Sequence, residues 1–153
     1  MPVTNDEIVS VLNDLIETCR DGQNGFQTAA ENISDPSTKR LFQGFGQQRA
    51  QFAGELQTIV REFGEDPTET GSVSGALHRG WMNLKGAISG KDEHAILEEC
   101  ERAEDTAVEA YEDALEKVVA ADVASVIRRQ YSAVQEAHNE IRSLRDRTKK
   151  ANA

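Results

Sequence analysis

The chain has 153 residues, of which 29% are charged and only 5% aromatic, and its formal net charge is −10. A chain of this length can form one domain with a substantial core, and we expect a single domain over residues 1–153. The acidic balance excludes most nucleic-acid binders, because phosphate contacts need clustered Lys and Arg. The sequence has no run of about 20 apolar residues and no signal-peptide core, so we expect a cytoplasmic protein without a membrane partner.

The first predicted helix covers about residues 5–34 and begins at a capping-box pattern formed by Thr4 and Glu7. The segment "DGQNG" at 21–25 also allows a break, because Asp-Gly and Asn-Gly are typical of turns. The apolar face continues through this segment, which favours one continuous but distorted helix. That face contains Ile8, Leu12, Leu15, Cys19, Gly22, Phe26, Ala29 and Ile33.

Three further long helices are predicted over about residues 36–63, 92–119 and 122–147. Each carries apolar residues three or four positions apart, and Asp35 and Asp92 can cap the first two of them. Four helices of similar length with one apolar face each are typical of a four-helix bundle. Short links join the first helix to the second and the third to the fourth, so we expect two antiparallel hairpins.

A long connection at residues 64–91 separates the two predicted hairpins. Its apolar spacing predicts a short helix over about 73–89 that lies across the bundle. For His78 and Trp81 within it, we favour a covering helix with a buried Trp81 over a binding site. A connection of this length lets the second and third long helices run parallel, as in ferritin-like folds. We therefore predict an all-α, ferritin-like four-helix bundle with one long crossover that carries a short fifth helix.

Polar residues are predicted to meet at one height of this bundle. With the hairpin turns as predicted, Gln48 lies level with Gln23, and Glu104 lies level with Gln135 and one turn from His138. A buried carboxylate is costly unless it is paired, and a protonated His138 is a ready partner for Glu104. The predicted structural polar layer contains Gln23, Gln48, Arg49, Glu104, Gln135 and His138.

The same positions resemble the ligand positions of di-iron proteins in the ferritin-like superfamily, where Glu and Glu-x-x-His come from each hairpin. This chain has Gln23, "QRAQ" at 48–51, Glu104 and "QEAH" at 135–138 in their place. Over nearly its whole length the chain also resembles an uncharacterised bacterial family of ferritin-like four-helix-bundle proteins. The resembling stretches are "DGQNGF", "QQRAQFAGELQ", "LHRGWMNLKGAISG", "AYEDAL" and "AHNEIRSLRD". The resemblance implies a fold and a family, but no reaction.

The departures from the di-iron pattern decide between two functional hypotheses. Two divalent irons need several carboxylates, whereas this layer has one central carboxylate, Glu104, one imidazole, His138, and amides. We therefore predict a non-enzymatic structural or interaction module with no catalytic residue and no cofactor. The alternative is an iron-binding oxidase or iron-handling protein in which Glu104 and His138 hold iron or another divalent metal at low occupancy. Its further candidate ligands are Gln48, Gln51 and Gln135.

The sequence also bears on disulfide formation and on self-association. Cys19 and Cys100 lie on core faces about 12 Å apart along the bundle axis, too far for a disulfide, so we predict buried free thiols. The resemblance to ferritin-like chains, which often associate through outer helix faces, implies a homodimer. The sequence does not indicate a particular protein partner.

Overall fold

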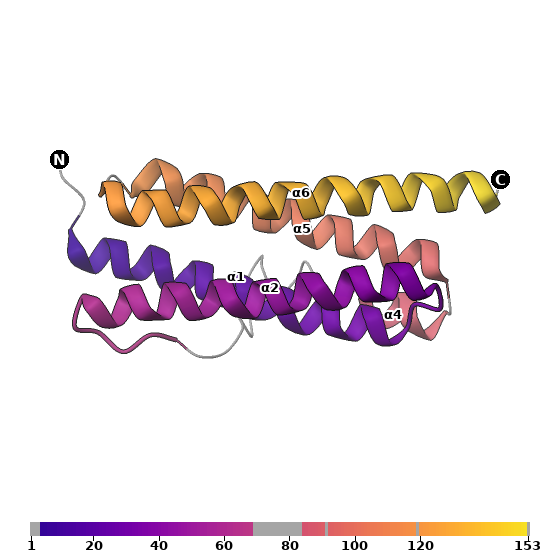
Figure 1. Ribbon diagram of the computed structural model, residues 1–153, viewed down its shortest axis with the longest axis horizontal. Helices are drawn as coiled ribbons and strands as arrows, with labels where there is room; N and C mark the ends of the chain where they lie inside the picture. Colours follow the sequence, from indigo (N-terminus) through magenta and orange to yellow (C-terminus); the bar gives the residue numbers. More distant parts are fainter. Residues whose placement is uncertain (1–3, 69–83, 91, 119, 153) are drawn as a thin grey trace.

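The computed structural model describes residues 4–68, 84–90, 92–118 and 120–152, and this part of the chain is all-α (Figure 1). The four long helices are α1 (Asn5–Glu31), α2 (Pro36–Glu62), α5 (Glu93–Lys117) and α6 (Ala121–Asn152). A short helix, α4 (Leu84–Ser89), lies between α2 and α5 in the sequence. No helix among the described residues is long and apolar enough to cross a membrane.

Side-chain caps fix where three of the long helices begin. The Thr4 hydroxyl accepts a hydrogen bond from the backbone N–H of Glu7 at 3.2 Å, so the predicted N-cap of α1 is present. Asp35 accepts from the backbone N–H of Thr38 at 2.9 Å, and Pro36 occupies the first turn of α2. Asp92 caps α5 in the same way, through the backbone N–H of Ala95.

The helix bounds differ from the predicted ones mainly at the C-terminal ends. Helix α1 ends at Glu31 rather than residue 34, because Asn32 closes the last turn with its backbone N–H on the carbonyl of Ala29. The helix is continuous through residues 21–25, which confirms that "DGQNG" does not break it. Helix α6 continues past residue 147 to Asn152. The predicted short helix over 73–89, with His78 and Trp81, falls mostly outside the described residues.

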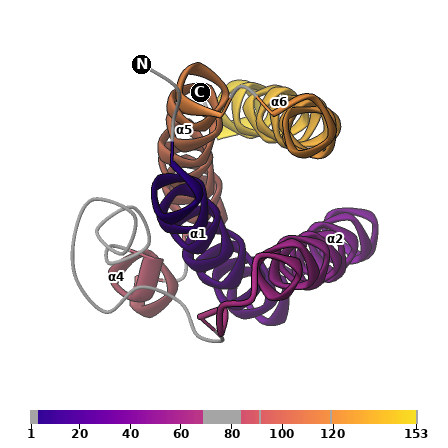
Figure 2. The same ribbon diagram turned by 90° about the vertical axis from the view of Figure 1, so that its left-hand side faces the viewer.

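The long helices pack as a bundle, which confirms that part of the prediction. Helices α1 and α2 form one antiparallel hairpin, and α5 and α6 form the other (Figure 1). Helix α1 packs against both α2 and α5, whereas α2 and α6 meet at few positions (Figure 2). Helices α2 and α5 begin at the same end of the bundle and therefore run in the same direction (Figure 1). Helix α4 covers α5 and, to a smaller extent, α1.

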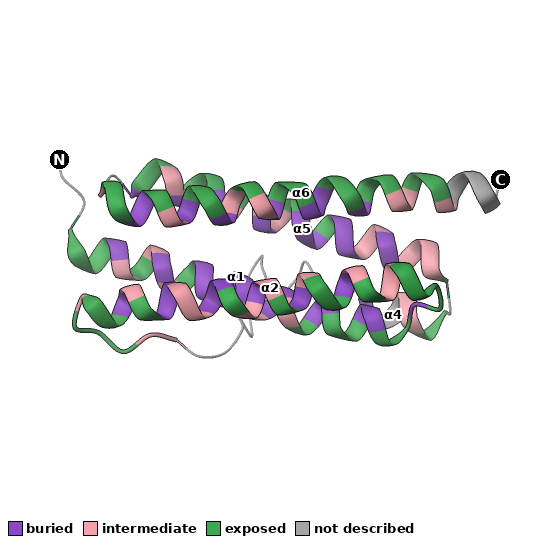
Figure 3. Cartoon of the chain, viewed as in Figure 1, coloured by how far each residue is buried: buried purple, intermediate pink, exposed green. Residues whose placement is uncertain are grey.

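The buried side chains form two apolar cores rather than one, and each long helix turns a buried face to the interior (Figure 3). Core A lies at the end of the bundle that holds the start of α1. Its fully buried members include Leu12, Ile16, Leu56, Tyr111 and Ile127. Core B lies at the end that holds the α1–α2 turn. Its fully buried members include Phe26, Phe42, Ile96 and Ile141.

Candidate functional site

A buried ion pair lies between core A and core B. Arg49 on α2 and Glu104 on α5 have side chains that are each only 1% exposed. The two terminal nitrogens of Arg49 donate to the two carboxylate oxygens of Glu104, with Nη1–Oε1 at 2.7 Å and Nη2–Oε2 at 2.5 Å. Burial disfavours the charged guanidinium, but the charge and hydrogen bonds of Glu104 outweigh it and raise the pKa of Arg49. Arg49 therefore stays charged inside the bundle.

Helix α1 provides the space that the Arg49 side chain occupies. A Cβ at Gly22 would lie 3.2 Å from Nη1 of Arg49 and 3.4 Å from its Cγ, so a larger residue would push against it. One turn further along α1, the Phe26 ring lies under the guanidinium, 5.3 Å from its central carbon to the ring centroid. Glycine costs about 1 kcal/mol in a helix interior relative to Ala. The space that the Arg49 side chain requires is a physical reason for a glycine at position 22.

The space around the ion pair is too small for a substrate. A cavity of about 10 Å³ lies beside Arg49 and Glu104, lined also by Thr18 and Asp21. A void of this size holds about one water molecule. The interior of the bundle at this height is therefore filled by the protein's own side chains.

A second polar feature, the four-helix relay, crosses core A. Cys19 on α1 lies 3.1 Å from the Tyr111 hydroxyl on α5, and Tyr111 donates to the side-chain oxygen of Gln130 on α6 at 2.7 Å. Since the Tyr111 proton goes to Gln130, the Cys19 thiol is the donor to Tyr111. The amide nitrogen of Gln130 in turn donates to the backbone carbonyl of Phe52 on α2 and to Glu55. One chain of hydrogen bonds thus joins all four long helices.

The relay holds its two acidic groups in their neutral forms. Burial raises the pKa of the Cys19 thiol to about 11, and burial also raises the pKa of the Tyr111 phenol well above its ordinary value. Cys100, the other free cysteine, is buried and its pKa is raised by burial as well. The prediction of two buried free thiols is confirmed. A neutral thiol is a poor nucleophile, so neither cysteine is activated for chemistry.

Alkaline pH is expected to destabilise the fold through Cys19. The thiol ionises near pH 9.0 in the unfolded chain but only near 11 in the folded one. Its contribution to stability is therefore full below pH 9.0 and is lost as the pH rises towards 11. We expect Cys19 alone to lower the free energy of unfolding by up to about 1.4 kcal/mol per pH unit in this window. Urea unfolding at a series of pH values measures this, and Cys19→Ser should flatten the decline. Parallel curves for the two proteins would contradict the assignment.

A third polar feature lies near the ion pair and links α5 to α6. This α5–α6 charge cluster consists of Glu101, Asp105, His138, Arg142 and Arg145. Nε2 of His138 on α6 lies 2.5 Å from Oδ1 of Asp105 and 3.9 Å from Oε1 of Glu101, both on α5. Glu101 is only 5% exposed and accepts hydrogen bonds from Arg142 and Arg145. Its single buried charge thus has two cationic partners.

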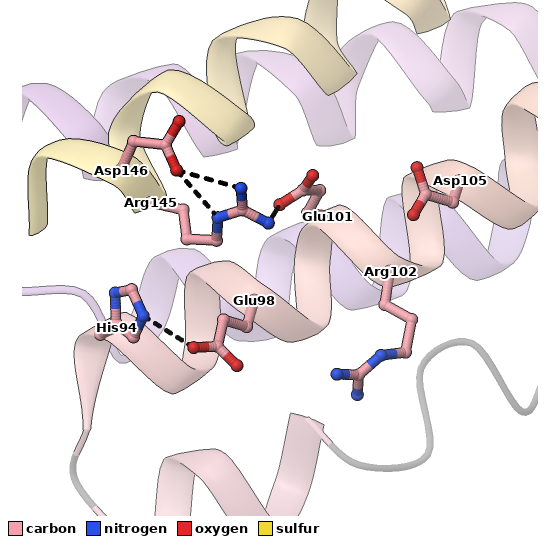
Figure 4. Close-up of a pocket in the computed structure, with 7 residues that line it drawn as sticks. All are labelled: His94, Glu98, Glu101, Arg102, Asp105, Arg145 and Asp146. Atoms are coloured by element: carbon pink, nitrogen blue, oxygen red, sulfur yellow. Dashed lines mark hydrogen bonds and ion pairs between the residues drawn. The ribbon is translucent and has the colours of Figure 1, made fainter. Parts of the chain in front are cut away.

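The α5–α6 charge cluster borders an open surface groove of about 380 Å³. Figure 4 shows Arg145 between Glu101 and Asp146, and His94 beside Glu98. The charged groups of the groove are thus largely paired with one another. The groove is lined by four acidic side chains, two arginines and one histidine.

Of the predicted polar layer, the structure brings Arg49 and Glu104 together. The partner of Glu104 is Arg49 and not His138, because the His138 ring is directed at Asp105 on the α5–α6 side of the bundle. The two candidate metal ligands, Glu104 and His138, therefore have separate partners. Among the described residues, no group of three or more His, Cys, Asp or Glu side chains is placed to hold a metal ion.

The hydrogen bonds of the predicted glutamines do not involve the Arg49–Glu104 pair. Gln23 is half-buried and accepts a hydrogen bond from Arg20 at 2.8 Å. The side-chain oxygen of Gln48 is buried and has no hydrogen-bond partner among the described residues. Gln135 is exposed and donates to the Tyr131 hydroxyl at 2.9 Å, and Gln51 is also exposed.

The sequence reasoning missed the four-helix relay. Gln130 is 0% exposed, whereas the neighbouring Tyr131 is half-buried. The signal was present, because Gln130 lies three residues after Ile127 and four before Val134, on the same face. An amide at that position needs buried partners, which Tyr111 and Phe52 supply.

The fold and this interior define a helical bundle with a buried salt-bridge network. Residues 7–117 match the family described as Domain of unknown function (DUF2383), and the chain belongs to this family. The matched region contains α1, α2 and α5 almost entirely, and with them Arg49, Glu104, Cys19 and Tyr111. Helix α6, which supplies Gln130 and His138, lies outside it. No match is found among curated proteins.

Proposed function

We propose that this DUF2383 protein is a ferritin-like bundle that acts as a structural or interaction module and catalyses no reaction. The ferritin-like assignment is supported by two antiparallel hairpins whose adjoining helices, α2 and α5, run in the same direction (Figure 1).

The observation that carries the proposal is the bidentate pairing of Arg49 with Glu104. In ferritin-like di-iron proteins, carboxylates and histidines from the helices meet in the bundle interior to hold the metals. Here both oxygens of the central carboxylate are bound by a guanidinium that is equally buried. A metal ion at Glu104 would have to displace Arg49 and leave its charge buried without a counter-ion, which is strongly unfavourable. The residues at this height therefore do not fit a di-iron centre.

Iron loading tests the proposal. Purified protein is incubated anaerobically with Fe(II), desalted and analysed for metal content, with a di-iron protein of the ferritin-like superfamily treated in parallel. We expect well under one iron per chain, and the same urea unfolding midpoint with and without a chelator, because no set of metal-binding side chains among the described residues competes with the Arg49–Glu104 pair.

The iron-handling alternative predicts the opposite result. Stoichiometric iron in the wild type that is lost in His138→Gln would contradict our proposal. His138→Gln is the suitable variant because His138 lies at the α5–α6 edge, so the Arg49–Glu104 pair stays intact.

A further inference from the structure

The ion pair leaves one hydrogen-bond donor of Arg49 without a partner. Nη1 and Nη2 donate to Glu104, but Nε is buried and has no hydrogen-bond partner among the described residues. Because the side chain is only 1% exposed, bulk solvent does not reach this N–H group. A buried N–H without an acceptor is unfavourable, and in folded proteins such groups are usually bound to the protein or to an ordered water.

The cavity of about 10 Å³ beside the ion pair is where an acceptor for this donor can lie. Arg49 itself lines it from α2, and on α5 it is bordered by two small residues, Ala103 and Ala107. A space of this size suits one water molecule and nothing larger. Water is bound stably in such a cavity only where two to four polar partners surround it, whereas an apolar cavity stays dry.

Helix α1 supplies two acceptors to the same cavity, Thr18 and Asp21. Thr18 is 4% exposed and donates its hydroxyl proton to the backbone carbonyl of Asp14 at 2.9 Å, so the lone pairs of Oγ1 are left to accept. Asp21 is 9% exposed and follows three residues later on the same face of α1. A carboxyl group has several lone pairs and accepts more than one hydrogen bond. The cavity thus combines one buried donor with two buried acceptors.

We propose that one water molecule is bound in this cavity as a fixed part of the ion-pair network. The water accepts a hydrogen bond from Nε of Arg49 and donates one to Oγ1 of Thr18 and one to the carboxyl group of Asp21. Three hydrogen bonds are typical of a buried water. The pair itself joins α2 and α5, and the water extends its hydrogen bonds to α1.

Two other polar residues line the cavity, but they are less suited to hold the water. Each carboxylate oxygen of Glu104 already accepts a hydrogen bond from Arg49. Thr106 on α5 is half-buried, so its hydroxyl is in part accessible to solvent from outside. Thr18 is therefore the residue whose hydroxyl we test.

High-resolution crystallography and NMR spectroscopy test for the bound water directly. We expect a peak of electron density within about 3.2 Å of both Nε of Arg49 and Oγ1 of Thr18. In solution, ¹⁵N-labelled protein should show a cross-peak between the water resonance and the Hε proton of Arg49 in a rotating-frame Overhauser experiment. Well-defined density for these side chains without a peak in the cavity would overturn the proposal.

Thr18→Val tests how the water is held, because it keeps the shape of the side chain and removes the acceptor. The matched control is Thr58→Val on α2, whose hydroxyl donates to the carbonyl of Gly54 at 3.1 Å in the same way but on an exposed face. We expect Thr18→Val to weaken the Arg49 cross-peak and to lower the urea unfolding midpoint, and Thr58→Val to leave both almost unchanged. A Thr18→Val protein that matches the Thr58→Val protein in both measurements would overturn the proposal.

Discussion

Replacing Glu104 by Ala is expected to lower the free energy of unfolding by about 3–5 kcal/mol. Arg49 keeps its charge under all ordinary conditions, and its side chain is 1% exposed, so the variant leaves a buried cation without a counter-ion. The small cavity beside the pair has room for about one water, which cannot replace two hydrogen bonds to a carboxylate. Urea unfolding followed by circular dichroism measures the loss.

Two further variants distinguish the cost of a buried charge without a partner from the net contribution of the ion pair to stability. Arg102→Ala removes an ion pair with Glu99 in which Arg102 is 56% exposed, and we expect a loss below about 1 kcal/mol. Arg49→Met/Glu104→Leu removes both charges and should recover most of the stability lost in the single variant. If Glu104→Ala lowers the free energy of unfolding no more than Arg102→Ala does, the Arg49–Glu104 pair does not behave as a buried ion pair.

Replacing Phe26 by Ala is expected to cost about 3–5 kcal/mol of unfolding free energy. The ring is 0% exposed in core B and packs against Phe42 and Phe45, with ring centroids 5.6 and 5.4 Å away. It also supports the guanidinium of Arg49. The loss therefore combines a large cavity with a weakened cation–π contact.

Phe26→Leu tests the two contributions to that loss, because it keeps most of the apolar volume and removes only the ring face. In a double-mutant cycle with Arg49→Met/Glu104→Leu, we expect a coupling of about 0.5–2 kcal/mol between the Phe26 ring and the ion pair. Phe45→Ala, at a half-buried position of the same aromatic cluster, is the matched control and should cost less than Phe26→Ala. Additive losses in the cycle would show that the ring does not interact with Arg49.

The helices could be predicted from the sequence, but the sequence did not identify Arg49 as the main partner of Glu104. Apolar spacing and caps such as Thr4 and Asp35 are local signals, and α1 and α2 start where they indicate. Gln48 and Glu104 each lie about twelve residues into helices that run in the same direction, which predicts that they lie at a similar height. Consecutive residues differ by 100° around a helix, however, and it is Arg49 rather than Gln48 that is hydrogen-bonded to Glu104.

The direction of a side chain around its helix also decides the contacts of His138 and Gln130. The His138 ring contacts Asp105 on the neighbouring helix. An amide next to an aromatic residue is usually the exposed one of the two, so the sequence does not indicate that Gln130 is buried. Only the packed structure shows that the amide is the buried one of the two.

The division of the interior into two cores restricts how the helices can slide along one another. A shift of α2 by one turn, about 5.4 Å, would move the guanidinium of Arg49 into an apolar core. It would also leave the carboxylate of Glu104 buried without its partner. Apolar side chains can repack in part after such a shift, whereas the ion pair has both its partners in one alignment alone. Among diverging sequences of this fold we therefore expect the apolar residues to interchange freely and the two charges to be kept, or lost, together.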